Sequence, residues 1–209
     1  LECVRLFYGL KVFQENSIVH HDLKQQNIVY NQKTNRINFI DFGFMTKKKT
    51  ILDLAEQSKY WLGDKNHWSF PLENVYWNKR NYIAAITDVN TDTNETYTSF
   101  AELVVKYCGY FFTSILPVNT DNTRYDKLTQ RATVASFENV IEFEKDEYDY
   151  FINKSIDTID SYGVGIALTY VLNRSKHLLS DELVKKLRDF FINDMLNPKV
   201  FLRLTPEQL

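Results

Sequence analysis

The sequence predicts a mainly helical protein that contains one short β-hairpin. Residues 1–16 place apolar side chains at helical spacing, and residues 155–173 form an apolar helical stretch that contains two glycines. Ser180 can cap the N-terminus of a further helix that runs through Met195, with two acidic residues in its first turn. These three stretches make helix the dominant element.

Strand-forming sequence is confined to one region. The apolar runs IVY at 28–30 and INFI at 37–40 flank the turn-rich segment NQKTNR, which predicts a β-hairpin. Shorter helices are expected at 51–62 and 100–116, and the three lysines at 47–49 are expected in a loop. The fold class is therefore mainly α with a single hairpin.

The composition is that of an ordinary globular chain of one domain, or at most two small ones, with 44% hydrophobic and 25% charged residues. A formal charge of −2 argues against a nucleic-acid partner and against a membrane-surface partner, since both need a basic excess. The apolar stretch 100–116 contains Glu102 and Lys106 and is shorter than the ~20 residues that cross a bilayer. Only two cysteines, Cys3 and Cys108, are present, which excludes a disulfide framework.

The chemically informative stretch reads HHDLKQQNIVYNQKTNRINFIDFG. A loop followed by a hairpin can bring Asp22, Asn27 and Asp41 to one edge. Asn27 and Asp41 offer hard oxygen ligands, which suit Mg²⁺ when nucleotide phosphates complete its coordination. Asp22 remains available to accept a proton from an attacking hydroxyl, and Lys24 can neutralise a transferring phosphoryl group. This pattern predicts phosphoryl transfer.

The same stretch resembles the catalytic loop and the metal-binding loop of eukaryotic-type protein kinases, of the serine/threonine type. The resemblance implies that Asp22 orients or deprotonates the substrate hydroxyl and that Lys24 contacts the γ-phosphate of ATP. It also implies that Asn27 and Asp41 bind Mg²⁺ and that Val29 lies under the adenine ring. In addition, it implies that the first histidine of the stretch stacks on the phenylalanine after Asp41.

Small-molecule phosphotransferases that resemble aminoglycoside kinases share this loop spacing, so the downstream sequence matters. Residues 70–73 (FPLE) resemble the Ala-Pro-Glu that closes a protein-kinase activation segment. Residues 160–165 (DSYGVG) resemble the Asp-x-Trp-x-x-Gly that opens the central helix, with tyrosine in place of tryptophan. The resemblance implies that Asp160 binds backbone N–H groups near His20 and that Arg203 pairs with Glu73. Their order along the chain favours the protein-kinase version.

The resemblance covers residues 1–76 and about 154–209, which correspond to the large C-terminal lobe of the kinase fold. Residues 1–209 are accordingly expected to form a protein-kinase-like large lobe without an N-terminal lobe, interrupted by an insertion at about 78–153. The insertion is expected to dock a partner or to be a surface elaboration. His21 replaces the family's arginine that binds an activating phosphate, and it could do so only when protonated.

The sequence thus predicts a serine/threonine-protein kinase that transfers the γ-phosphate of ATP, with Mg²⁺, to a protein substrate and that needs an N-terminal lobe not present in this chain. The alternative is a catalytically weak pseudokinase that serves as a protein-binding scaffold. A cytoplasmic location is expected because no secretory signal opens the chain. The abundance of Asn, Lys and Ile suggests an AT-rich genome such as that of a large DNA virus, which would place the protein in the host cytoplasm, or that of a protozoan parasite.

Overall fold

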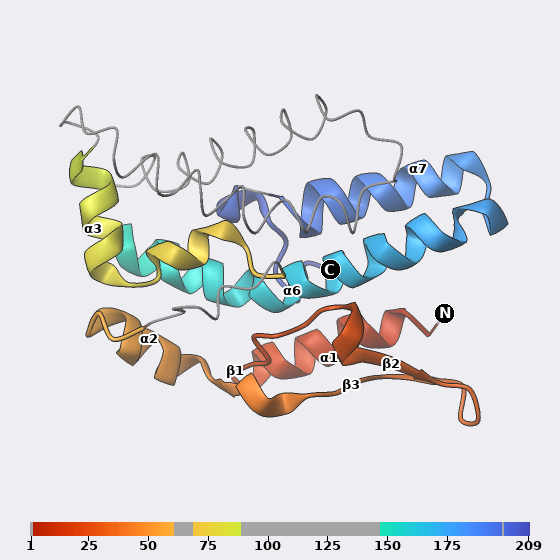
Figure 1. Ribbon diagram of the computed structural model, residues 1–209, viewed down its shortest axis with the longest axis horizontal. Coiled ribbons are helices and arrows are strands. Elements are labelled where there is room, and N and C mark those ends of the chain that lie inside the picture. Colours follow the sequence, from red (N-terminus) through yellow and green to blue (C-terminus); the bar gives the residue numbers. More distant parts are fainter. Residues whose placement is uncertain (1, 61–68, 89–146, 198) are drawn as a thin grey trace. The chain divides into compact units, whose positions relative to one another are not determined.

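The computed structural model describes residues 2–60, 69–88, 147–197 and 199–209 (Figure 1). The protein is mainly helical, as the sequence predicts, and its described strands form two small antiparallel sheets. The chain divides into two compact units. The first contains residues 1–50, 156–197 and 202–209, and the second contains residues 51–155 and 198–201.

Helix α1 (Val4–Glu15) confirms the helix predicted near the start of the sequence. Its buried residues, Leu6 and Leu10, lie four positions apart and therefore on one face. The helix ends at Glu15 with Asn16 as its C-cap, and the following Ser17 adopts a left-handed conformation with φ 53°. This turn directs the chain into strand β1 (Ile18–Val19).

The predicted hairpin is also confirmed. Strand β2 (Ile28–Asn31) pairs antiparallel with β3 (Arg36–Phe39), so that Ile28 lies opposite Phe39. The side chain of Asn31 stabilises the turn, because its Oδ1 accepts hydrogen bonds from the backbone N–H groups of Lys33 and Thr34. The hairpin therefore places the residues before β2 beside those after β3.

The predicted loop at residues 47–49 is wrong. Strand β4 (Thr46–Lys47) pairs antiparallel with β1, and Lys48 begins helix α2 (Lys48–Glu56). A two-residue strand shows no alternation in its sequence, and three consecutive lysines resemble loop residues. Tertiary pairing with β1 therefore decides the conformation here.

Helix α6 (Tyr148–Ser175) is 28 residues long and starts earlier than the predicted 155–173. Its additional N-terminal part belongs to the second unit, where Tyr148, Phe151 and Ile152 are buried. In the first unit, α6 joins α1 and the C-terminal helices in one hydrophobic core, formed by Leu6, Leu10, Leu23, Val164, Leu168, Leu172, Phe191 and Met195.

The helix predicted from Ser180 to Met195 is confirmed, although its last part differs from an ordinary α-helix. Helix α7 (Asp181–Asp189) is capped by Ser180, whose Oγ accepts a hydrogen bond from Leu183 N. It continues as a π-helical turn over residues 190–195. This turn keeps Phe191 and Met195 in the core.

The second unit contains the end of α2, a 3₁₀ helix (Leu72–Tyr76), helix α3 (Lys79–Asp88) and the start of α6. Trp77 is fully buried there, and its Nε1–H donates to Ser155 Oγ at 2.7 Å. Most of the predicted insertion, including the stretch 100–116 that is expected to be helical, lies outside the described residues. Among the described helices, none has the length and apolar character that crossing a membrane requires.

Candidate active site

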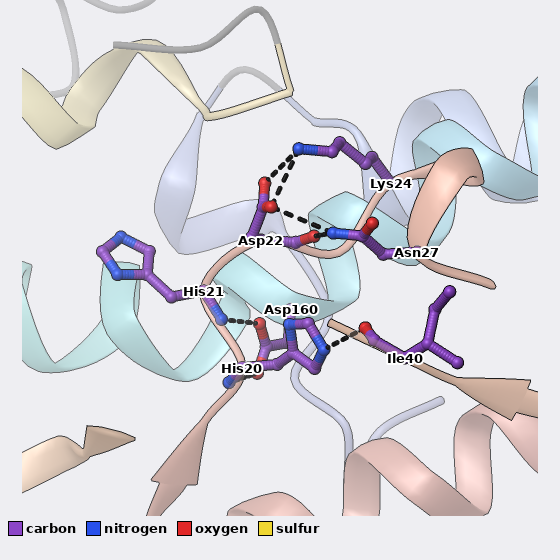
Figure 2. Close-up of polar contacts among 7 residues, drawn as sticks. All are labelled: His20, His21, Asp22, Lys24, Asn27, Ile40 and Asp160. Carbon is purple, nitrogen blue, oxygen red and sulfur yellow. Dashed lines mark hydrogen bonds and ion pairs between the residues drawn. The ribbon is translucent and has the colours of Figure 1, made fainter. Parts of the chain in front are cut away.

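Asp160 anchors the loop that follows β1, which we call the Asp22 loop (residues 20–27). The two oxygens of its carboxylate accept hydrogen bonds from His20 N at 2.7 Å and His21 N at 2.8 Å (Figure 2). Burial raises the pKa of the Asp160 carboxyl, and the two N–H donors act in the opposite direction. The contact expected between Asp160 and this loop is thus confirmed across about 140 residues of sequence.

His20 connects the Asp22 loop to the loop after β3, which we call the Asp41 loop (residues 40–45). Its Nε2 lies 3.1 Å from Ile40 O, and because a carbonyl can only accept, this nitrogen carries the proton. The rings of His20 and Phe42 are 5.3 Å apart, as expected from the sequence. The buried imidazole therefore fixes one loop against the other.

Asp22, Lys24 and Asn27 form one hydrogen-bonded set (Figure 2). Lys24 Nζ contacts the two carboxylate oxygens of Asp22 at 2.7 and 2.8 Å. Asn27 Nδ2 donates to the backbone oxygen of Asp22 at 2.7 Å and to its Oδ2 at 2.9 Å. Since both neighbours are acceptors, the orientation of the Asn27 amide is determined. Its oxygen accepts no hydrogen bond within the described chain.

The hairpin brings Asn27 and Asp41 close together. Ile40 N donates to Asn27 O at 2.9 Å, so Asp41 follows directly after a residue that is bonded to Asn27. Asp41 is exposed, and its carboxylate has no hydrogen bond or ion pair within the described ranges. It adopts a left-handed conformation, with φ 61° and ψ 70°. Strain of this kind in a residue other than glycine is typical of functional sites.

The donor set suits a magnesium ion. The side-chain oxygen of Asn27 and the carboxylate of Asp41 have no hydrogen-bond partner among the described residues. The described residues contain no cluster of three or more His, Cys, Asp or Glu that could bind a metal ion through protein ligands alone. Mg²⁺ is commonly held by one or two protein oxygens, with phosphate and water completing the octahedron. Asn27 and Asp41 therefore suit a Mg²⁺ ion whose remaining ligands are phosphate oxygens and water.

Val29 lies on the outer face of β2 and is 37% exposed. Its neighbours Ile28 and Tyr30 point to the opposite face, because side chains alternate along a strand. That face borders a cavity of about 540 Å³, which α1, the hairpin and α6 line. Val29 does not line this cavity and is available to an outer ligand.

His21 is buried, and burial lowers its pKa to about 4 against the opposing effect of the Asp22 charge. The imidazole is therefore neutral at pH 7. Its backbone is left-handed, with φ 70°. A neutral His21 cannot supply the positive charge that an arginine would supply at this position.

Two supports of the site were not predicted from the sequence. A Cβ atom on Gly163 would lie 2.3 Å from Leu23 O, so only glycine allows α6 to approach the Asp22 loop this closely. Lys48 Nζ donates to Asp157 Oδ1 at 2.7 Å. Asp157 and Asp160 are three residues apart in one apolar helix and therefore lie on the same side of it. This spacing could have indicated that Asp157, like Asp160, binds a neighbouring segment.

Arg203 is buried within the first unit. Its Nη2–H donates to Asn197 O at 3.0 Å, and its guanidinium carbon lies 4.8 Å from the centre of the Tyr162 ring. The Tyr162 ring thus packs against the arginine side chain. The expected partner Glu73 belongs to the second unit, where it accepts a hydrogen bond from Ser155 Oγ, so the Arg203–Glu73 pair stays a prediction.

No family model matches this sequence, and neither a curated protein nor a solved structure matches it. A functional assignment therefore depends on the chemistry of the site itself.

Proposed function

We propose that the protein is a protein-kinase-like phosphotransferase that transfers the γ-phosphate of ATP, with Mg²⁺, to a serine or threonine hydroxyl of a protein. The observation that carries this proposal is the convergence of two loops. Asp22, Lys24 and Asn27 form one bonded set, and the hairpin brings the unpaired, strained Asp41 next to it. A carboxylate base, a lysine and two oxygen ligands are among the groups that phosphoryl transfer requires.

Each residue has a distinct role in this proposal. Asp22 orients the substrate hydroxyl and accepts its proton at a carboxylate oxygen. Lys24 contacts the Asp22 carboxylate in this structure. A transferring phosphoryl group would compete with Asp22 for the Lys24 ammonium group, whose positive charge would stabilise the negative charge of the phosphoryl oxygens. Asn27 and Asp41 would hold Mg²⁺, which supplies neutralisation of the phosphate charge when bound. Val29 would contact the adenine ring.

A catalytically weak scaffold is the second candidate. One observation favours it: the Asp22 carboxylate already accepts hydrogen bonds from Lys24 and Asn27. A closed set of this kind also fits a purely structural loop. The two candidates differ in whether Asp41 and Asp22 matter for chemistry.

The deciding experiment measures Mg²⁺-dependent transfer of phosphate from γ-labelled ATP by the longest native polypeptide that contains this segment. Peptide libraries with Ser, Thr or Tyr as acceptor identify the acceptor residue. We expect Asp22→Asn and Asp41→Asn each to reduce transfer at least ~100-fold, because such groups typically contribute 10²–10⁴-fold. Asp189→Asn, an exposed residue at the end of α7, is the matched control. An inactive parent whose melting temperature is unchanged by Mg-ATP would refute the proposal.

A further inference from the structure

The chain that leaves the Asp41 loop is bound to α6 by an ion pair. Lys48 Nζ donates to Asp157 Oδ1 at 2.7 Å, and the two side chains are only 22% and 29% exposed. The main chain is fixed at the same point, since Lys48 N donates to Ser17 O at 2.9 Å. Immediately before it, β4 pairs with β1. Lys48 therefore completes the attachment of this segment.

Asp157 and Asp160 are three residues apart in α6, so they lie on the same side of the helix. Asp160 holds the chain that enters the Asp22 loop, through two backbone N–H groups. Asp157 holds the chain that leaves the Asp41 loop, through Lys48. Both aspartates and Lys48 line one cavity of about 20 Å³. The two loops are thus attached to neighbouring points of one helix.

We propose that Lys48 and Asp157 are a positioning pair that holds Asp41 in its left-handed conformation, a role that rests on the proposed function. A strained residue persists only when its surroundings determine its conformation on both sides. On the N-terminal side, Ile40 is fixed by hydrogen bonds to Asn27 and His20. On the C-terminal side, the restraint comes from β4 and the Lys48–Asp157 pair.

Hydrogen exchange of the native polypeptide tests this role without requiring activity. In Lys48→Met and in Asp157→Asn we expect the amides of residues 41–47 to exchange about 5-fold to 10-fold faster than in the parent. The amides of α1 should be unchanged. Lys48→Arg should retain protection, because it can still reach the carboxylate. Lys79→Met removes another ion pair, to Glu56 at 2.6 Å, and should leave residues 41–47 unaffected.

A second measurement connects the pair to magnesium. The Mg²⁺ concentration for half-maximal binding of a fluorescent ATP analogue should rise about 3-fold to 10-fold in Lys48→Met. It should rise equally in the Lys48→Met/Asp157→Asn double variant, because both changes remove one interaction. If Lys48→Met does not fold, Asp157→Asn carries both comparisons. Unchanged hydrogen exchange at residues 41–47 in the folded variants would overturn the positioning role of Lys48 and Asp157. A parent protein that binds no Mg-nucleotide would instead refute the proposed function.

Discussion

Removal of the Asp160 carboxylate should destabilise the protein strongly. Asp160→Ala leaves two buried backbone N–H groups, of His20 and His21, without their acceptors. Each unsatisfied donor costs about 1–3 kcal/mol, which sets an upper limit near 6 kcal/mol for the pair. Because burial raises the pKa of Asp160, loss of the buried charge offsets part of this effect. We therefore expect a decrease of about 3 kcal/mol in the free energy of unfolding.

Urea unfolding monitored by circular dichroism would measure this change. Asp160→Asn retains one acceptor oxygen and should lose about half as much, roughly 1.5 kcal/mol. Asp189→Ala, at an exposed position of α7, should change the stability by less than about 0.5 kcal/mol. A decrease of less than about 1 kcal/mol in Asp160→Ala would refute the view that this carboxylate anchors the loop.

Three further predictions concern two residues beside the site and one buried residue of the second unit. Gly163→Ala should lower the free energy of unfolding by about 1–3 kcal/mol, because the added Cβ would lie 2.3 Å from Leu23 O. In the same urea assay, Gly43→Ala is the control and should change this free energy by less than about 1 kcal/mol, because its Cβ would meet only one atom, at 3.5 Å. The contribution of His21 to the stability should fall by up to about 3 kcal/mol as the pH drops from 6.5 to 4, because its folded pKa is about 4 and the unfolded chain binds the proton first. His21→Asn, which tolerates the positive φ, should flatten that profile in pH-dependent unfolding, and an identical profile would contradict this assignment. Trp77→Phe should lower the free energy of unfolding by about 1–3 kcal/mol, because it removes the buried 2.7 Å hydrogen bond to Ser155 Oγ. An unchanged melting temperature would show that this hydrogen bond contributes nothing to stability.

Local signals explain which elements could be predicted. Helix α1 has its apolar residues at helical spacing, and Ser180 caps α7 through its own side chain, so both are decided within a few residues. The hairpin is likewise a short-range feature. In contrast, β4 exists only because β1 lies beside it. Residues 137–153 are expected from their sequence to be partly helical, but their continuity with the helix at 155–173 depends on the burial of Tyr148 and its neighbours.

The candidate site shows the same division. The sequence by itself determined which residue types are present at Asp22, Lys24, Asn27 and Asp41, because their chemistry and spacing are local properties. The contact of Asp160 with the Asp22 loop was implied only by the resemblance to protein kinases and not by these local properties.

Only the tertiary structure decided how these groups are held. The neutral state of His21 and the contact between Lys48 and Asp157 both depend on residues distant in sequence. The close approach of Gly163 to Leu23 is of the same kind. The physical reason is that burial and ion pairing between distant segments arise from tertiary packing, which a pattern of neighbouring residues does not encode.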